Sequence, residues 1–408
     1  MGKATYTVLI TDPSGATILA ALGAGDADDG APGITSLQVG PRANQVGSGS
    51  FTLTATPDVL AAVSAPDNRA VVLCDREGLP TLTRMAGPIE SKPYTYTADR
   101  DGADGPGTVT VNFADDTAML ADMLIYPDPA HASTAQTTAR YVISAVNPED
   151  AARTLVNVQC GPGAIAARQL PGLVLGTDHG LLPGVTISTS FTRAQSVTDG
   201  LREICRQAST LGLGYRIVWT SARTLAFDVY QPVDRSASVW FSRDLGNIID
   251  VLYEPTAPTG TVAIVGDETA GTGRIIHERV NTAAHTAGWR RREVFVDGRS
   301  AANSGELDQL GDQAVADGRP HTKVTARVRE TDNLRYQIDF NDLDLVSFEV
   351  AAGVFVTEQI QGADITWSPD KGEQVSPLIG ADSLELTDAK AKQIRDLQRQ
   401  MALLHGAL

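Results

Sequence analysis

The sequence predicts an α+β fold in which β structure predominates, and three observations support this. Short apolar segments that alternate with polar residues, broken by Gly, Pro and Asp, fill residues 4–126 and again residues 236–385. Between them, residues 196–230 combine one amphipathic helix with one β-hairpin. A second helical pattern lies near the end of the chain. The predicted parts are a first β domain (1–126), an α+β middle module (127–235), a second β domain (236–385) and a C-terminal helix (386–408).

The helix of the middle module is the clearest pattern in the chain. Ser196 is its predicted N-cap, and Gly212 is predicted to end it with a positive φ. Alternating segments at 215–219 and 225–229 predict an adjacent hairpin, which this helix covers through Leu201, Ile204, Cys205 and Leu211. The full apolar face follows a period of 3.6 residues: Val197, Leu201, Ile204, Cys205, Ala208 and Leu211.

In the first β domain, Asp12-Pro13-Ser14-Gly15 predicts a turn between two strands within residues 4–22. Phe51, Leu53 and Ala55 lie on one face of a later strand. The other predicted elements are a strand at 34–39, a helical turn after Pro57, a hairpin at 70–73 and 79–85, a long strand at 87–97 paired with 108–113, and a helix at 116–124.

Residues 127–138 read as a polar connector, after which Asn147 and Pro148 predict the start of a helix that runs to Gln159. A strand at 185–191 then leads to the central helix. In the second β domain we predict a turn at 244–247, strands at 248–253, 260–266, 323–329, 334–340, 345–355 and 356–367, and a helix at 305–317, while residues 271–288 lack a clear pattern.

Composition excludes several classes of protein. A formal net charge of -16 disfavours a surface that binds nucleic acid, because non-specific affinity for phosphates comes mainly from Lys and Arg. No run of about 18 apolar residues is present, and the N-terminus passes directly into a strand pattern, so neither membrane insertion nor export is expected. Cys74, Cys160 and Cys205 are far apart and outside any C-x-x-C motif, so we expect three buried thiols.

Two stretches resemble metal-binding motifs only in part. His277-Glu278-Arg279-Val280-Asn281 starts like the zinc-protease helix motif but has Asn where the second His must lie. Asp99-Arg100-Asp101-Gly102-Ala103-Asp104 lacks the spaced acids and the terminal Glu of a calcium-binding EF-hand loop. An ordinary loop is favoured for the first and a solvated hairpin tip for the second.

Two further stretches fail as phosphate sites. Gly266 and Gly271 have P-loop spacing, but Thr272 stands where Lys is required. Trp289-Arg290-Arg291-Arg292 could meet a phosphate backbone, although Arg on an exposed strand edge is the simpler interpretation. We therefore predict no catalytic residue, no metal site, no cofactor and no enzymatic activity.

Five short stretches carry a resemblance through their order along the chain. They are Arg42 with Asn44, Gly49-Ser50-Phe51-Thr52-Leu53, Gly87-Pro88-Ile89, Leu245-Gly246-Asn247 and Asp342-Leu343-Asp344-Leu345-Val346. Together with the middle module they resemble the minor tail proteins of long-tailed actinobacterial phages, the tail-hub or baseplate-hub family. The resemblance is diffuse, covers nearly the whole chain and includes no catalytic motif. The chain departs from the family pattern at Leu343, where Gly is expected, and at Asp122, where relatives tend to have Arg.

The resemblance implies two β-barrel-like tube domains per chain and a homotrimer whose six barrels form a ring at the virion tail tip. Synthesis in the cytoplasm of the bacterial host is implied as well. The implied partners are a distal tail protein, a tape-measure protein, and a tail fibre or other tip proteins. DNA would pass the lumen without specific binding, which suits an acidic chain. A tail-derived injection device would use the same ring.

Two alternatives from other classes are a tail-associated cell-wall hydrolase and a carbohydrate-binding tail adhesin. The sequence lacks a nucleophile elbow, a complete metal motif and a Cys/His signature, which weighs against the hydrolase. An aromatic content of 5% weighs mildly against a sugar-binding platform. A structural hub protein therefore remains the leading interpretation.

The C-terminal helix is predicted to form a partner-helix interface. Thr387 is a plausible N-cap, and the apolar residues that follow have the 3-4-3-4 spacing of coiled-coil a and d positions: Ile394, Leu397, Met401, Leu404 and Leu408. With only two to three heptads, this pattern specifies no stoichiometry. The helix either packs back on its own β domain or docks a fibre or the next tip protein; the second is our hypothesis.

Overall fold

The computed structural model describes residues 4–23, 33–95, 107–193, 195–209, 211–267, 274–299, 301, 303–328, 330–331 and 333–380. The chain divides into two compact units: Met1–Asp250 with Ala326–Leu378, and Val251–Thr325 with Ile379–Leu408. The four-part division from the sequence is finer and stays a prediction. Among the helices of the described ranges, none has the length and apolar character needed to cross a membrane.

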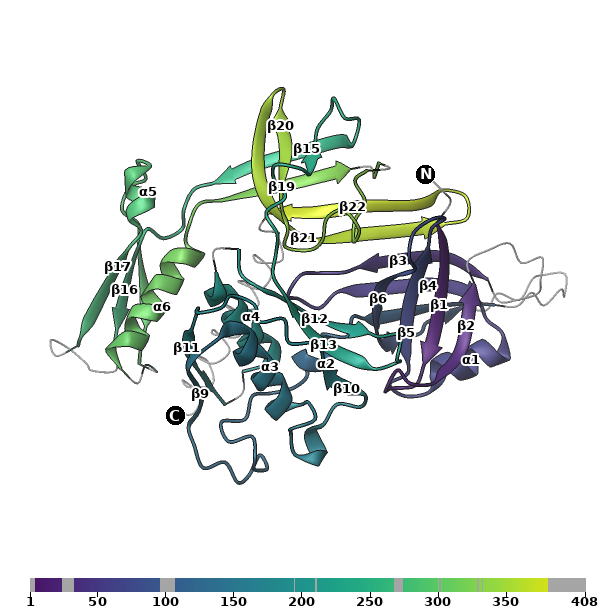
Figure 1. The fold of residues 1–408 in the computed structure, drawn as a ribbon, viewed down its shortest axis with the longest axis horizontal. Coiled ribbons are helices and arrows are strands. Elements are labelled where there is room, and N and C mark those ends of the chain that lie inside the picture. Colours follow the sequence, from purple (N-terminus) through teal and green to yellow (C-terminus); the bar gives the residue numbers. More distant parts are fainter. Residues whose placement is uncertain are drawn as a thin grey trace. The chain divides into compact units, whose positions relative to one another are not determined.

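Strands dominate the first unit, as predicted (Figure 1). The part of the main sheet that begins at β22 has the order β22-β21-β3-β4-β8-β6-β5-β1-β2, with β20 paired to β21, β14 to β20 and β7 to β8; on its other side β22 pairs with β19 (His321–Val328), which pairs with β15 (Ile248–Thr256). This path has two ends, so the described strands form an open sheet in which we find no closed barrel. The strands are β1 (Thr5–Thr11), β2 (Ile18–Gly23), β3 (Ile34–Gly40), β4 (Ser48–Thr54), β5 (Arg69–Asp75), β6 (Leu82–Ser91), β7 (Tyr94–Thr95), β8 (Thr108–Ala114), β14 (Trp240–Phe241), β20 (Leu345–Ala351), β21 (Val354–Ser368) and β22 (Gly372–Gly380).

Strands from the two ends of the chain are joined in this sheet. Late strand β21 pairs antiparallel with early strand β3, and the register places Ile365 opposite Val39 and Trp367 opposite Leu37. All four side chains are buried. The two predicted β halves of the sequence therefore share one sheet.

Several elements of the first β region follow the sequence prediction. The Asp12–Gly15 turn joins β1 to β2, and Phe51, Leu53 and Ala55 are buried together. Helix α1 (Pro57–Ser64) begins after Thr56, whose hydroxyl accepts from the Val59 amide. Helix α2 (Ala118–Ala121) is shorter than the predicted helix at 116–124.

The middle region packs two helices against small sheets. Predicted caps are confirmed: Asn147 Oδ1 accepts from the Glu149 amide at 2.9 Å, and Ser196 Oγ accepts from the Asp199 amide at 3.0 Å. One buried cluster joins these elements, with Leu155, Leu201 and Phe227 fully buried. The elements are β9 (Arg140–Val146), α3 (Pro148–Gln159), the 3₁₀ turn η2 (Ala166–Arg168), β10 (Leu173–Leu175), β11 (Ile187–Thr192), α4 (Val197–Ala208), β12 (Gly214–Trp219) and β13 (Leu225–Tyr230).

The end of α4 differs from the prediction. The helix stops at Ala208 because Ser209 is extended, with φ -162° and ψ 177°. Leu211 therefore lies beyond the helix and is only partly buried, while Leu213 fills the core there. Gly212 does have a positive φ of 73°, but it belongs to the turn that leads into β12.

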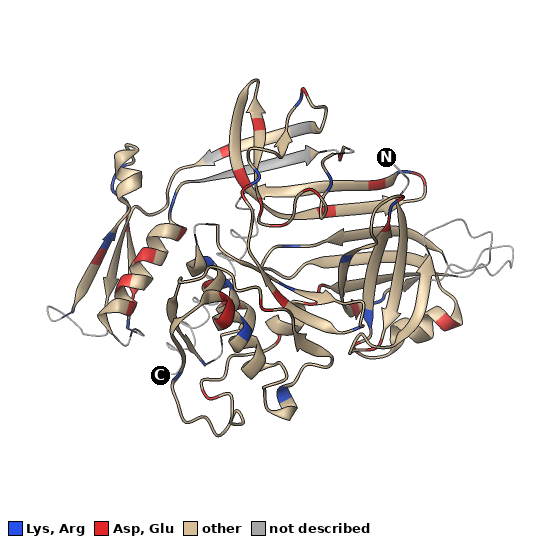
Figure 2. Cartoon of the chain, in the orientation of Figure 1, with Lys and Arg blue, Asp and Glu red and all other residues tan. Residues whose placement is uncertain are grey.

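The second unit contains a three-stranded sheet of order β17-β16-β18, with β16 antiparallel to β17 and parallel to β18. Helix α6, along which acidic residues lie (Figure 2), packs closely on this sheet. A Cβ at Gly311 would approach Arg279 Cγ to 2.4 Å. The elements are β16 (Val262–Gly266), β17 (Ile276–Val280), α5 (Thr282–Thr286), β18 (Glu293–Asp297) and α6 (Ser304–Asp317); β15 (Ile248–Thr256) and β19 (His321–Val328) carry the chain in and out.

Other predictions of secondary structure were wrong or incomplete. Residues 334–340 form turns and isolated bridges in place of a strand. The predicted strand at 79–85 and the start of the predicted strand at 87–97 form one strand, β6, which runs without a break through Gly87 and Pro88 to Ser91, and the short strand β7 follows it. The sequence analysis did not predict β9, β10, β17, α5, β18 or β22.

Candidate functional site

The predicted partner-helix interface, formed by Ile394, Leu397, Met401, Leu404 and Leu408, lies outside the described residues. The same holds for the acidic loop at 99–104 and for Gly271 and Thr272. These predictions stay untested by the structure.

His277 lies on strand β17, not on a helix of the zinc-protease type. Its Nδ1 is 2.8 Å from Asp308 Oδ1 of α6. Two strand positions further on, the Arg279 guanidinium donates to both carboxylate oxygens of Asp312, at 2.6 and 2.8 Å. These pairs attach α6 to the sheet, so His277 and Arg279 each have a structural role.

The basic cluster at 289–292 is largely committed to local contacts. Arg291 forms ion pairs with Glu278 at 3.0 Å and Glu293 at 2.6 Å, and Arg292 donates to the Pro258 carbonyl at 2.5 Å. A phosphate ligand would have to displace these acidic partners of Arg291. The cluster lies in the segment just before the edge strand β18, not on a strand as predicted, and its contacts disfavour a phosphate site.

Within the described ranges, no group of three His, Cys, Asp or Glu side chains is arranged to hold a metal ion. Cys74, Cys160 and Cys205 are buried free thiols, as predicted. Burial raises the pKa of Cys160 and of Cys205 to about 12, so both remain protonated at neutral pH.

A hydrogen-bonded polar region lies in the first unit, where the β3–β4 loop meets the middle region. Asn44, with φ 53°, donates from Nδ2 to the Leu213 carbonyl at 2.8 Å and accepts at Oδ1 from the Tyr215 amide at 2.9 Å. Its own carbonyl accepts from Arg202 Nε at 2.9 Å and from the Tyr215 hydroxyl at 3.0 Å. One residue thus links the first sheet to α4 and β12 through four hydrogen bonds.

The neighbouring residue Arg42 links the same loop to strand β21. Its guanidinium donates to the Ala363 carbonyl at 2.9 Å and to Asp364 at 2.6 Å. A Cβ at Gly362 would lie 2.2 Å from the Pro41 carbonyl oxygen, so only Gly allows this approach. Arg42 and Asn44, which the sequence analysis used only as markers of a family, therefore form a structural joint.

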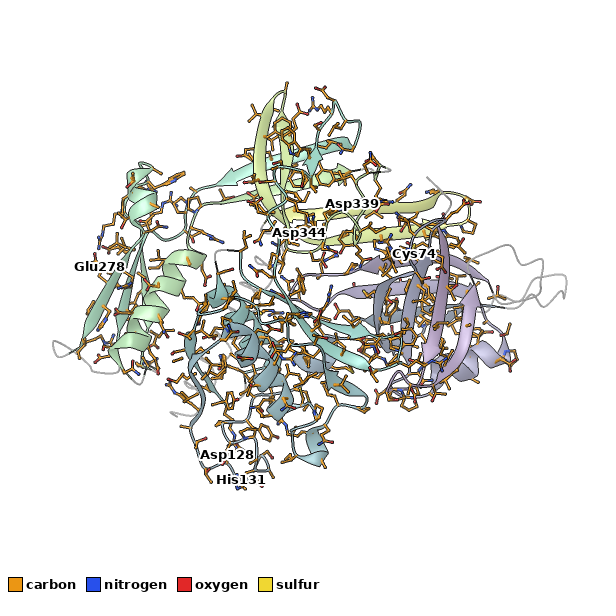
Figure 3. The ribbon with its side chains drawn as sticks, viewed as in Figure 1. Cys74, Asp128, His131, Glu278, Asp339 and Asp344 are labelled. Atoms are coloured by element: carbon orange, nitrogen blue, oxygen red, sulfur yellow. The ribbon has the colours of Figure 1, made fainter. Side chains whose placement is uncertain are left out.

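Asp344 connects the start of β20 with residues 233–235, at the end of the middle region. Its carboxylate accepts from the Val233 amide at 2.9 Å, from Arg235 Nε at 2.8 Å and from the Asn341 amide at 3.0 Å (Figure 3). The residue is 3% exposed. Three donors satisfy a carboxylate that would otherwise be costly to bury.

A second ionic cluster connects the first sheet with strand β22. Glu373 accepts from Arg84 at 2.8 Å and also pairs with Arg76 and with the Tyr6 hydroxyl. Burial alone would raise the pKa of Glu373, but the nearby charge of Arg84 and the bond from Tyr6 lower it. Arg76 also pairs with Glu330 at 2.6 Å. Sequence reasoning found none of these pairs, because the partners are roughly 250 to 370 positions apart.

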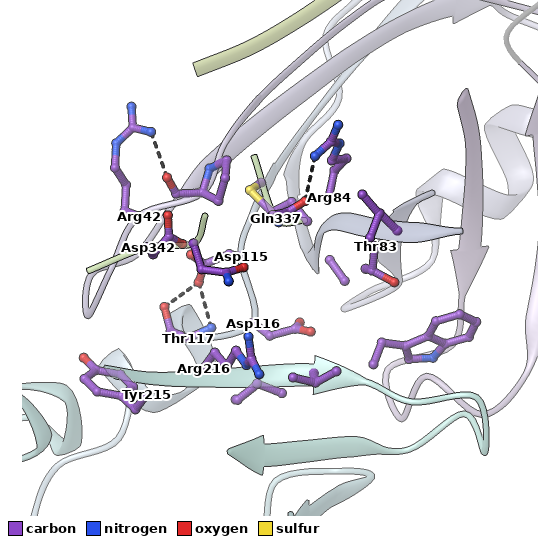
Figure 4. A pocket seen from close by; sticks show the side chains of 18 of the residues that line it. Arg42, Thr83, Arg84, Asp115, Asp116, Thr117, Tyr215, Arg216, Gln337 and Asp342 are labelled. Carbon is purple, nitrogen blue, oxygen red and sulfur yellow. Dashed lines mark hydrogen bonds between the residues drawn. The ribbon is translucent and has the colours of Figure 1, made fainter. Parts of the chain in front are cut away.

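A cavity of about 370 Å³, whose walls include Arg42 and Arg84 of these joints, is a candidate ligand site in the described part of the first unit (Figure 4). We call it the junction cavity. Six separate stretches of the first unit contribute its walls: Pro41 and Arg42; Thr81 to Ala86; Asp115 to Thr117; Tyr215 to Trp219; Tyr230; and Gln337 with Asn341 and Asp342.

Three carboxyl groups in the wall of the junction cavity have perturbed acidity. Burial raises the pKa of Asp115 to about 6, although bonds from Thr117 and from the Gly47 amide oppose the shift. It raises the pKa of Asp116 to about 7, against the opposing charge of Arg69. Asp342 keeps some accessible surface on the cavity side, but the atoms packed around its carboxyl raise its pKa to about 6. These three carboxyl groups therefore titrate closer to neutral pH than exposed aspartates do.

Comparison with known proteins gives the family and the fold. A model of the family described as Siphovirus ReqiPepy6 Gp37-like protein matches residues 30–381. No curated protein matches the chain in sequence.

Two solved structures are similar over nearly the whole chain. The 43 kDa tail protein of prophage MuSo2 from Shewanella oneidensis has 13% identity and a TM-score of 0.52, covering 91% of this chain and 98% of that one. The tail protein from Neisseria meningitidis MC58 has 14% identity and a TM-score of 0.53, covering 93% and 97%. At such identities the similarity shows the fold alone. The chain has the fold of phage tail proteins and belongs to the siphovirus ReqiPepy6 Gp37-like family.

Proposed function

We propose that the chain is a structural hub protein at the tail tip of a phage, or of a tail-derived injection device, with an actinobacterial host. Three copies form a ring in which each chain supplies two barrel-like segments, and the ring continues the tail tube. The ring anchors a distal tail protein, a tape-measure protein and a fibre or other tip proteins. Membership of a siphovirus family and the tail-protein fold support this proposal.

The observation that carries the proposal is the single sheet built from both ends of the chain. Pairing of β21 with β3, together with the contact of Arg42 with Asp364, joins the early and late parts of the first unit. A ring that continues a tail tube must resist deformation, and a sheet shared by distant parts of the chain favours that resistance. The net charge of -16 supports a lumen along which DNA slides without binding.

Electron microscopy of the purified chain tests the ring. We expect a three-fold particle with six-fold pseudo-symmetry and an open, acid-lined lumen. Mass photometry should give three chains per particle at the same concentration. A monomer at assembly concentrations, or a particle with a solid centre, contradicts the hub.

We also propose that the protein has no enzymatic activity. Zymography on host cell walls tests the rival hydrolase, and clear lysis that one carboxylate substitution abolishes would replace the hub by an enzyme. Saturable binding of host cell-wall glycans by the isolated chain would instead support the adhesin.

The C-terminal segment is proposed to dock a fibre or the next tip protein. Deleting residues 387–408 should then leave the ring and its melting temperature nearly unchanged while abolishing recruitment of the distal tip. Loss of ring assembly would assign the segment to the hub itself.

A further inference from the structure

The hairpin formed by β20 and β21 (Figure 1) ends in an exposed apolar tip. Every residue from 351 to 355 is exposed and uncharged. Phe355 lies beside Trp240 of β14, with ring centroids 5.2 Å apart, and the two side chains are 40% and 44% exposed. Contiguous exposed apolar residues mark interaction sites on soluble proteins. We call Trp240, Leu245, Val354 and Phe355, all of which are exposed, the hairpin patch.

Hydrogen bonds from one carboxylate hold the two turns of the hairpin patch together. Glu349 accepts from the Gly353 amide at 3.0 Å, in the hairpin tip, and from the Arg243 amide at 2.9 Å, in the turn that contains Leu245. Glu349 itself is buried, so the patch presents apolar side chains and not this charge. A surface that is already ordered loses little conformational entropy on association, which favours tight binding.

The second unit has an apolar surface of its own, on the face of its sheet opposite α6. His277 and Arg279 of β17 pair with acids of α6, so the residues that alternate with them lie on the other face. We call the apolar residues of that face, which the strand register brings together, the open sheet face: Ile264, Ile276, Val280 and Phe295. Phe295 is 61% exposed, so much of this face is uncovered within the described residues.

Acids at the open sheet face are bound within the second unit. Glu278 and Glu293 both pair with Arg291, at 3.0 and 2.6 Å. The hairpin patch has no charged member. Permanent interfaces between copies of one chain are more apolar than other interfaces, and charged residues are depleted from their cores. Both surfaces therefore fit a lasting contact between copies better than a transient contact.

A cyclic ring of identical chains needs two different surfaces on each chain, because every contact is made head to tail. We propose that the hairpin patch of one copy packs on the open sheet face of the next copy, and that this contact holds the three-fold ring together. The contact presupposes the ring proposed above and adds the surfaces that form it. A two-fold contact of one surface with itself would instead give a dimer and leave the other surface exposed.

Sedimentation velocity of the purified full chain tests the contact. Phe355→Asp places a charge in the hairpin patch, and Phe295→Asp places one in the open sheet face. Each variant alone should be a monomer at concentrations where the parent forms three-chain particles, and the concentration of half-assembly should rise at least about tenfold. Both side chains are exposed, so each chain should still fold. Phe355→Ser and Phe295→Ser replace the Asp variants if Asp lowers the melting temperature.

An equimolar mixture of the two variants tests whether the two surfaces bind each other. One chain then has an intact open sheet face and the other an intact hairpin patch, so a two-chain particle should form although neither variant assembles alone. Val142→Asp is the matched control, because this exposed residue of β9 belongs to neither surface. It should assemble like the parent chain.

Parent-like assembly of either Phe variant would overturn the contact while leaving the ring itself in place. A mixture that stays monomeric would also overturn it and would assign the two surfaces to other tail proteins. A two-chain particle formed by one variant alone would show that a surface binds itself, which contradicts a head-to-tail contact. A parent chain that stays monomeric would contradict the ring, and the contact with it.

Discussion

Replacement of Asn44 by Ala should separate the first sheet from the middle region. The change removes the donor to the Leu213 carbonyl and the acceptor for the Tyr215 amide. Both residues are at least 98% buried, so each group left unpaired costs about 1–3 kcal/mol. Ala must also adopt the left-handed conformation at φ 53°, which costs about 1–2 kcal/mol more than in Gly. We expect a loss of about 3–8 kcal/mol in the free energy of unfolding.

Urea unfolding and limited proteolysis measure this loss. Asn44→Gly should be about 1 kcal/mol more stable than Asn44→Ala, because Gly removes the backbone strain but not the lost hydrogen bonds. Asn44→Asp keeps the acceptor and loses the donor, so it should fall between the parent and Ala. Proteolysis of Asn44→Ala should release the middle region at lower urea than in the parent.

Asn157→Ala is the matched control for the same chemical change. Asn157 Oδ1 accepts from the Gly163 amide at 2.9 Å in a local and exposed turn. Its replacement should cost less than about 1 kcal/mol. If Asn44→Ala unfolds within about 1 kcal/mol of the parent, Asn44 does not join the two regions as its four hydrogen bonds indicate.

Three further predictions concern the core, the cavity and the backbone. Leu201→Ala should lower the free energy of unfolding by about 2–5 kcal/mol because this side chain is fully buried; a loss below about 1 kcal/mol in urea would contradict that. The pKa values of about 6 for Asp115 and Asp342 and about 7 for Asp116 lie above those of the unfolded chain. Between about pH 4 and 7 the folded state therefore binds more protons than the unfolded chain. The contribution of these groups to the free energy of unfolding falls as the pH rises through that range. Asp342→Asn should flatten the dependence of the urea midpoint on pH. Leu343→Gly should change the free energy of unfolding little, since backbone relief and lost burial oppose each other; a change above about 3 kcal/mol would refute this.

Helix starts could be predicted because their signals are local. Asn147 and Ser196 bond to amides two and three positions ahead, so a few residues of sequence contain the whole interaction. The end of α4 has no such local signal: the turn after Ala208 lets Leu213 enter the core, and Leu211, at an equally good helical position, is only partly buried.

Strand β17 was not predicted because its apolar side chains are exposed, whereas two of its polar side chains face the neighbouring helix. Ile276 and Val280 are 49% and 44% exposed, whereas His277 and Arg279 point to α6 and pair with its acids. A pattern that assigns apolar residues to the core cannot find such a strand. Only the acidic face of α6, distant in sequence, explains it.

At residues 334–340 a strand was predicted, but the chain forms a loop. Leu334, Tyr336 and Phe340 are buried with strand-like spacing, yet Arg335 bonds to Asp339 four positions on and closes a turn. The Tyr336 hydroxyl then reaches Asp342 in the cavity wall. The alternating apolar residues therefore belong to a loop that packs on the core, not to a strand.

The junction cavity could not be predicted at all, because its walls come from six stretches and no single stretch contains a motif. What the sequence did contain was the acid pair Asp115-Asp116, whose significance depends on burial. Pairing of β6 with β8 and the close approach of Gly87 to the Ala114 carbonyl, where a Cβ would lie 2.0 Å away, bring that pair inside.

Leu343 occupies a position where the family resemblance leads us to expect Gly. The backbone conformation at this position explains both the expected Gly and how Leu can replace it. The position expected to hold Gly has φ 65°, so the backbone does require the left-handed conformation there. The conformation is held by the Leu343 amide, which donates to the Ile360 carbonyl at 2.6 Å, and by the Leu343 carbonyl, which accepts from Gln359 at 2.9 Å. Left-handed Leu costs about 1–2 kcal/mol, but burying a Leu side chain contributes about 1.5–3 kcal/mol, and this one is 7% exposed. Burial therefore offsets the strain, and the register of β20 is kept although the expected Gly is missing.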